Sequence, residues 1–259
     1  MFRFALFLLI GVSCAHATSI VVKLDKQNIV IAADTLGIDA TGGVHQDQCK
    51  IVVAGRTAFA ATGIASFTPS LSSPLPAMSS WDAKSEATTA YAANTNDLGG
   101  AANEWLTKAE QYFTRLPPAD QRRARSLTGG DPDNVLVGGV FVGWSPSGTP
   151  ELIMEYVRYE KPYSGRVQHL VQILPIRDLP YTTNAVTQRL FETDLTLMRA
   201  TAAKWKNQAK GFPESERTWR WLEFLIRQTS EYAKVGTTVD VLELRQHGQP
   251  VWLQNLTCK

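Results

Sequence analysis

This sequence has no large excess of either charge. It also has few long apolar runs and no signature of a nucleic-acid-binding protein. The 259 residues carry 26 lysines and arginines against 24 aspartates and glutamates, a net charge of +2. Without a basic excess, a nucleic-acid partner is not indicated. Beyond the first 17 residues, no stretch approaches the roughly 18 apolar residues of a membrane-spanning helix, so we expect no membrane span.

Motifs for metals, phosphates and an elbow-type serine nucleophile are also missing. His45, His169 and His247 are scattered, without the spacing of metal ligands. Residues 131–134 lack a calcium-loop pattern, and no phosphate-binding glycine loop is present. The serines within residues 143–148 have the wrong spacing for a nucleophile elbow. We therefore expect neither a metal nor a cofactor.

The amino-terminal segment is typical of an export signal. Arg3 supplies a positive charge, residues 4–12 form a nine-residue apolar run, and Ala-His-Ala at 15–17 fits a signal-peptidase site. Nine apolar residues are too few to span a bilayer. The pattern predicts a signal peptide over residues 1–17 and an exported protein, periplasmic or secreted, formed by residues 18–259.

A second interpretation of this segment stays open. The Val-Ser-Cys sequence that ends at Cys14 loosely resembles a lipoprotein site, although Gly11 stands where such sites usually carry a large aliphatic residue. Acylation of Cys14 would leave Thr18 inside the chain. Cleavage after Ala17 would instead make Thr18 the first residue, with a free amino group.

Cysteine usage leaves one structural question open. Without Cys14, the exported chain keeps Cys49 and Cys258. An exported protein can hold a disulfide, and two cysteines permit only one, but the sequence does not give the distance between them.

Strand and helix patterns predict a single α+β domain over residues 18–259. Strands are expected at 19–24, 29–33, 50–53, 57–61, 134–142, 152–158, 167–174, 237–244 and 251–253, and helices at 101–116, 183–210 and 213–233. Residues 65–100, rich in serine, alanine, threonine and proline, read as a long loop or insert with one or two helical turns.

Cleavage after residue 17 would create a catalytic group from Thr18 alone. A hydroxyl and a primary amine would share this residue, and an amine with a pKa near ~8 can act as base toward its own hydroxyl, through a water. Asp34 ends a predicted strand and Lys50 begins another. A lysine beside the amine would disfavour a second positive charge there, and a carboxylate would hold the lysine in place.

These residues resemble a known family. The sequences TSIVV from Thr18, IVIAADT through Asp34, CKI around Lys50 and AATG ending at Gly63 are similar to the start of proteasome β-type subunits and their bacterial relatives. Those proteins are N-terminal nucleophile (Ntn) hydrolases. The steps of 16 residues from Thr18 to Asp34 and 16 from Asp34 to Lys50 are those of the family's catalytic residues. The similarity is clear over 18–65 and looser at 134–157 and 230–245.

The resemblance implies a fold and further site residues. It implies a four-layer αββα sandwich, and an oxyanion hole made by a backbone N–H at Gly63 or Ile64. It also implies a substrate pocket lined by the four positions Gly37, Gln48, Thr62 and Ser66.

Some of the family's features do not align. Its supporting aspartate falls near Glu231 or Tyr232, and its supporting serine near Val235. A glycine- and serine-containing turn before the first late helix reads Pro-Tyr-Thr-Thr at 180–183, and the segment 65–100 replaces a helix that helps to build rings. A homo-oligomer is compatible with the sequence, but a ring does not follow from it.

The resulting prediction is an exported threonine hydrolase that cleaves peptide or other small amide bonds through an ester acyl-enzyme. Two alternatives stay open: an inactive secreted or lipid-anchored binding protein, and an amidase for non-peptide amides. The state of residue 18 in the exported protein distinguishes the first alternative from the enzyme.

Overall fold

The computed structural model describes residues 18–38, 44–70, 79–128, 135–160, 166–233 and 235–258. The predicted signal peptide, including Cys14, lies outside these ranges. Every strand pairing in the described part is antiparallel. No helix in this part is both long enough and apolar enough to cross a bilayer.

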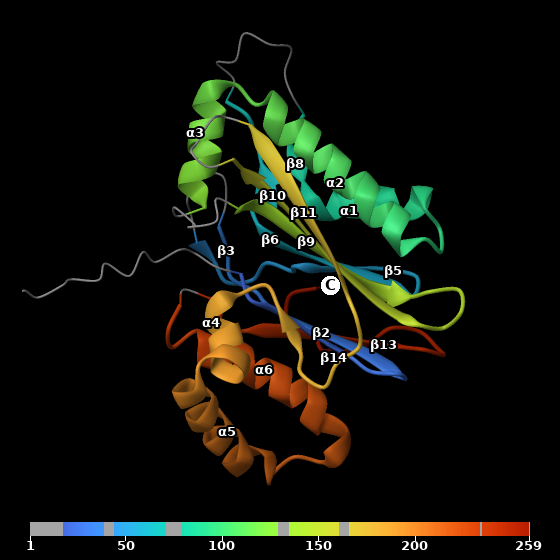
Figure 1. The fold of residues 1–259 in the computed structure, drawn as a ribbon, viewed down its shortest axis with the longest axis vertical. Coiled ribbons are helices and arrows are strands. Elements are labelled where there is room, and N and C mark those ends of the chain that lie inside the picture. Colours follow the sequence, from blue (N-terminus) through green and yellow to red (C-terminus); the bar gives the residue numbers. More distant parts are fainter. Residues whose placement is uncertain are drawn as a thin grey trace, which may run out of the picture.

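Two five-stranded sheets form the centre of the molecule (Figure 1). The first sheet has the order β12 (Tyr181–Thr182), β1 (Ile20–Leu24), β2 (Asn28–Asp34), β13 (Val239–Arg245) and β14 (Val251–Gln254). The second sheet has the order β11 (Val167–Leu174), β10 (Pro150–Tyr159), β9 (Val135–Trp144), β6 (Thr57–Gly63) and β5 (Ile51–Ala54). Two small sheets pair β3 (Gly37–Ile38) with β4 (Val44–His45), and β7 (Ser66–Phe67) with β8 (Trp81–Asp82).

The apolar residues of β1 explain why the two large sheets face each other. Successive side chains of a strand point to opposite faces. Ile20, Val22 and Leu24 join a buried cluster with Ala60 of β6 and Val140 of β9, which lies between the sheets. Because the other face of the first sheet is also apolar, it needs a cover of its own.

Helices supply that cover on both sides (Figure 1). The helices are α1 (Ala83–Ala93), α2 (Leu98–Arg115), α3 (Pro118–Leu127), α4 (Ala185–Gln188), α5 (Leu195–Ala209) and α6 (Arg217–Thr229), with a π-helical turn η1 (Arg189–Thr193) and a 3-10 turn η2 (Glu214–Glu216). Leu222, Leu225 and Ile226 of α6 pack on Val21 and Val241 of the first sheet. The aromatic residues of α2 pack on the second sheet, where Trp105 is fully buried.

The predicted four-layer αββα sandwich is wrong for this chain. The described residues form two five-stranded sheets, two two-stranded sheets and six α-helices, with about 37% of residues helical and 33% in strands. The central residues of β11 are exposed, and α5 makes its main contacts with α6 and η1 rather than with a sheet. Thr201 is the only buried residue of α5, and Trp205 of this helix packs on Trp221 and Phe224 of α6 rather than on a sheet.

Three local predictions also differ from the structure. The long loop expected over 65–100 is wrong for its second half, which contains α1 and the start of α2. The helix expected over 213–233 starts with the 3-10 turn η2, and its α-helical part is α6 at Arg217–Thr229. The single helix expected over 183–210 is interrupted at Asp194, whose side chain accepts hydrogen bonds from Thr196 N and Leu197 N and so caps α5.

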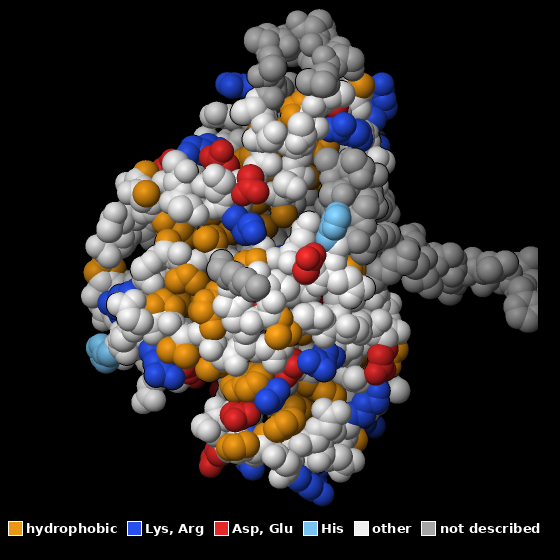
Figure 2. All heavy atoms as spheres, turned by 180° about the vertical axis from the view of Figure 1, so that it is seen from behind, with side chains coloured by type: hydrophobic (Ala, Val, Ile, Leu, Met, Phe, Trp, Pro, Cys, Tyr) orange, Lys and Arg blue, Asp and Glu red, His pale blue; other side chains and the backbone are white. Residues whose placement is uncertain are grey.

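Charged side chains are mixed on the surface. Figure 2 shows lysine and arginine interspersed with aspartate and glutamate over the described part of one face, with hydrophobic side chains between them. This distribution follows from the near balance of the two signs in the sequence.

Glu155 in β10 is a buried acid that should make the stability depend on pH. Burial raises the pKa of this carboxyl from its ordinary value of 4.5 to about 7. Its side chain is 1% exposed, and its Oε2 has no hydrogen-bond partner among the described residues. The pKa of Glu155 is higher in the folded protein than in the unfolded chain. Its contribution to the free energy of unfolding is therefore largest below pH 4.5 and is lost as the pH rises to about 7.

The change in the free energy of unfolding caused by Glu155→Gln should therefore be about 2 kcal/mol more stabilising at pH 8 than at pH 5. Chemical denaturation of both proteins at the two pH values measures the difference. Glu214→Gln, at an exposed position in η2, is the matched control and should change little at either pH. An equal effect of Glu155→Gln at both pH values would contradict an ionised, poorly solvated carboxylate.

Candidate active site

Thr18 lies beside Asp34 because β1 and β2 form an antiparallel hairpin. In this hairpin Ile20 pairs with Ala33, so the residues before β1 reach the end of β2. Ser19 N donates to Asp34 Oδ1 at 2.8 Å, and Asp34 N donates to the Ser19 carbonyl at 3.1 Å. These bonds hold the backbone that follows Thr18 against the carboxylate.

Lys50 completes the group from the second sheet. It stands directly before β5, and its Nζ lies 3.1 Å from Thr18 Oγ1 and 2.9 Å from Asp34 Oδ1. Lys50 and Asp34 are buried, whereas Thr18 is half-buried. The structure therefore brings the three predicted catalytic side chains together, with the cation between the hydroxyl and the carboxylate.

Burial sets the electrostatics of this group. Desolvation lowers the pKa of Lys50, and the neighbouring Asp34 carboxylate opposes the shift through its charge and its hydrogen bond. A lysine with a lowered pKa gives up a proton more readily than one in water. A cation this close to Thr18 Oγ1 also favours a negative charge on that oxygen.

The second oxygen of Asp34 is held by backbone amides that the sequence analysis did not single out. Gly236 N donates to Asp34 Oδ2 at 2.8 Å, and Leu36 N donates to it at 3.2 Å. A Cβ atom at Gly236 would lie 2.8 Å from Leu36 N, so only glycine fits this approach without a shift. The available signal was the Val-Gly-Thr-Thr sequence before β13.

A buried chain of hydroxyl groups extends from the residue after Thr18. Ser19 Oγ lies 2.8 Å from Thr187 Oγ1, which lies 2.8 Å from Thr229 Oγ1. Thr229 in turn donates to the Leu225 carbonyl at 2.8 Å. The chain joins the start of β1 to α4 and α6, and no spacing in the sequence points to it.

The two candidate oxyanion donors differ in their surroundings. Ile64 N donates to the Leu136 carbonyl at 2.7 Å, so this amide is already engaged. Gly63 is exposed and has a φ of 73°, and a Cβ there would lie 2.5 Å from the Leu136 oxygen. Glycine is therefore required at this position, which is the last residue of β6.

The four predicted pocket residues lie on different segments of the chain. Gln48 lies against Gly37: a Cβ at Gly37 would be 1.8 Å from Gln48 Oε1. Thr62 is half-buried, with its methyl group against Gly138, and Ser66 is exposed on β7. Gly37 therefore lies against Gln48, whereas Thr62 lies against Gly138 of β9 in the second sheet.

The positions where the family has its supporting aspartate and serine do not join the Thr18 group. Glu231 is paired with Lys204 at 3.1 Å on the surface, and Tyr232 is 50% exposed. Val235 is buried and offers no side-chain hydroxyl. Supporting contacts come instead from Gly236 N and from the Ser19 hydroxyl chain.

The structure settles the cysteine question by joining Cys49 to Cys258. The bond spans 209 residues of sequence and lies directly before Lys50. Among the described residues, no cluster of three or more histidines, cysteines, aspartates or glutamates is arranged to hold a metal.

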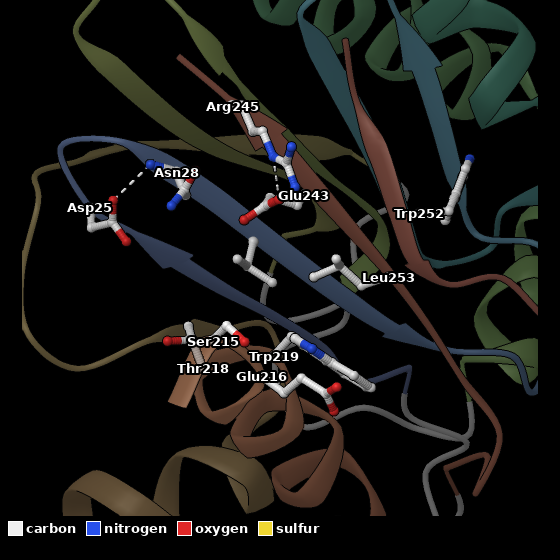
Figure 3. A pocket seen from close by; sticks show the side chains of 11 residues that line it. Asp25, Asn28, Ser215, Glu216, Thr218, Trp219, Glu243, Arg245, Trp252 and Leu253 are labelled. Carbon is white, nitrogen blue, oxygen red and sulfur yellow. Dashed lines mark hydrogen bonds and ion pairs between the residues drawn. The ribbon is translucent and has the colours of Figure 1, made fainter. Parts of the chain in front are cut away.

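A separate hollow of about 560 Å³ lies at the other end of the first sheet (Figure 3). Asn28 lines it, six residues along β2 from Asp34, or about 20 Å at the usual strand rise. Its charged groups already have partners: Arg245 Nε bonds Glu243 at 2.7 Å, and Asp25 accepts from Asn28 N at 2.7 Å. Figure 3 shows both contacts at the hollow, which contains none of the predicted site residues.

No family model matches the chain, and no curated protein is similar to it at a significant level. The functional interpretation therefore depends on the residues around Thr18.

Proposed function

We propose that this protein is an exported threonine-type amidohydrolase, related in its catalytic residues to the Ntn hydrolases. Cleavage after Ala17 would release the Thr18 amine and so activate the protein. The observation that carries the proposal is the position of Lys50 Nζ, 3.1 Å from Thr18 Oγ1 and 2.9 Å from Asp34 Oδ1. The proposal rests on these side chains and not on the overall fold.

The chemistry follows from the roles of the three residues. Thr18 Oγ1 attacks the carbonyl carbon of an amide, and its proton passes through a water to the neutral Thr18 amine. Lys50 lowers the energy of the negatively charged oxygen and disfavours protonation of the amine, and Asp34 holds the ammonium in place. No metal or cofactor takes part.

Of the two oxyanion candidates we favour Gly63, because the Ile64 amide is engaged by Leu136. A backbone N–H at this position would stabilise the oxygen of the tetrahedral intermediate. The intermediate collapses as the proton is returned to the leaving amine, which leaves an ester on Thr18 and a free amine product. Attack of water on the ester then releases the acid and restores the hydroxyl.

The substrate class is a peptide or a small amide. Thr18 is only half-buried, so an extended chain can reach its hydroxyl. Export would separate the enzyme from ATP-driven unfolding, and unfolded or short peptides then fit better than folded proteins.

Intact-mass measurement and labelling test the proposal. The exported protein should begin at Thr18 and should form a stoichiometric adduct with a threonine-directed electrophile such as a β-lactone. Peptide mapping should locate the adduct on Thr18. A matched control is the chain expressed without export, which keeps residues 1–17 and should not react because its Thr18 nitrogen is an amide. An exported chain that begins at an acylated Cys14 would contradict the enzyme and favour a lipid-anchored binding protein.

A further inference from the structure

The segment directly before Lys50 is not held by strand pairing. Residues 46–49 precede β5 without belonging to a strand. Gln48 N donates to the Thr35 carbonyl at 3.0 Å, and Lys84 Nζ of α1 donates to the Cys49 carbonyl at 2.6 Å. The side chain of Cys49 is fixed by its bond to Cys258. The disulfide is thus the covalent anchor of the residue next to Lys50.

The other end of the disulfide is itself anchored beside the site. Asp240 in β13 is 1% exposed, and it accepts hydrogen bonds from Leu256 N at 2.6 Å and Thr257 N at 3.1 Å. Asp240 pairs in the sheet with Ala33, the neighbour of Asp34. Cys258 is buried in the cluster between the two large sheets. The carboxyl-terminal segment therefore links the strand end that carries Asp34 to the one that carries Lys50.

We propose that the Cys49–Cys258 disulfide is a positioning element for Lys50, so that the threonine site is fully assembled only in the oxidised protein. This inference rests on the proposed function. In the oxidation step, two thiols exchange with a disulfide oxidant: the Cys49–Cys258 bond forms, the oxidant's S–S bond breaks, and two thiols of the oxidant are released. Export would then be needed for two steps of site assembly. Cleavage of the signal peptide frees the Thr18 amine, and the oxidising compartment allows the disulfide to form.

Reduction should loosen the site without removing its other contacts. The bonds from Thr35 and Lys84 to residues 46–49 do not depend on sulfur, and neither does the Asp34–Lys50 ion pair. A shift of about 1 Å at a catalytic group can reduce a rate by about 100-fold. We therefore expect a rate loss of tenfold or more in a protein that is still folded.

Reduction should also change the pH dependence, which a purely structural bond would not do. The charged group that contacts Lys50 is Asp34 from β2. Two further charged groups face the disulfide segment: Lys84 from α1 reaches the Cys49 carbonyl, and Asp240 from β13 binds the tail. If Lys50 moves away from Thr18, the Thr18 amine loses a neighbouring positive charge and its pKa rises. The acidic limb of the rate profile should then move to higher pH.

The experiment compares oxidised and reduced protein that begins at Thr18. The rate of β-lactone adduct formation on Thr18 is measured from pH 5 to 9, with and without dithiothreitol, and peptide mapping separates this adduct from any on a cysteine. Circular dichroism confirms that the reduced protein is folded. The Cys49→Ser/Cys258→Ser double variant should behave like the reduced protein and should not respond to dithiothreitol.

The possible results distinguish whether the disulfide positions Lys50. A tenfold slower reaction with a shifted acidic limb, in folded reduced protein and in the double variant, supports it. An unchanged rate and profile would overturn it while leaving the proposed function intact, as would a slower rate explained by unfolding alone. If the oxidised protein itself fails to label Thr18, the proposed function is rejected instead.

Discussion

Thr18→Ala should abolish hydrolysis and labelling, lowering kcat/KM by at least about 10⁴-fold, because the nucleophile would be missing. The fold should persist, since Thr18 is half-buried and precedes β1 rather than lying within it. The free energy of unfolding should change by no more than about 1 kcal/mol. Initial rates on a peptide amide substrate, together with thermal unfolding, measure both effects.

Thr18→Ser and Ser19→Ala are the matched variants. Thr18→Ser keeps a hydroxyl and an amine on the first residue, so it should keep measurable turnover and labelling. Ser19→Ala removes a hydroxyl one residue away, which bonds Thr187 and not Lys50, and it should reduce the rate far less than Thr18→Ala. Intact mass must show residue 18 at the amino terminus of every variant. Full turnover by Thr18→Ala would exclude Thr18 as the nucleophile.

The sequence predicted the Thr18 group through the spacing that resembles Ntn hydrolases, and local pairing accounts only for the approach of Thr18 to Asp34. Thr18 precedes β1 and Asp34 ends β2, so both lie at the open end of one hairpin, whereas Lys50 directly precedes β5, which pairs with β6 in the other sheet. Their spacing could be read without knowing the rest of the chain. Whether Cys49 bonds Cys258 could not be read, because the two lie 209 residues apart and their approach depends on how β13 pairs with β2.

The supporting contacts were missed for the same reason. Gly236 and Thr187 reach the site from segments about 200 and 170 residues away from the groups that they bind. The Val-Gly-Thr-Thr sequence marks Gly236 only as a residue before a strand, and a threonine in a short helix gives no sign of such a role. Only the register of β13 on β2 and the packing of α4 on the first sheet place them there.

Composition misled the interpretation of residues 65–100. The buried residues of α1 are Ala83, Ala87 and Ala90, together with Tyr91, so its covering face is made largely of small side chains. An alanine face gives a weak hydrophobic pattern, and the surrounding serines and threonines favour the assignment of a loop. The four-layer fold was implied by the family resemblance of the Thr18 segment, which carries no information on whether the distant helix α5 lies on a sheet.

Lys50→Met should lower kcat/KM by about 10³-fold, because it removes the positive charge that lies 3.1 Å from Thr18 Oγ1. Methionine has a similar length, so the side chain still fills the site. The Thr18 amine would lose a neighbouring cation and its pKa would rise, so the residual activity should need a higher pH. Rate profiles from pH 5 to 10 measure both changes.

Stability must be separated from catalysis in this variant, because Lys50→Met leaves Asp34 buried without its ion-pair partner. Removal of one partner from a buried pair typically costs about 3 to 5 kcal/mol. The double variant Lys50→Met/Asp34→Asn removes both charges and should recover only part of that stability, because asparagine keeps one of the two oxygens that accept backbone hydrogen bonds, while its activity stays as low as that of Lys50→Met. Activity that returned with stability would mean that Lys50 only holds the fold together. Low activity in a stable double variant would instead place the cation in the reaction itself.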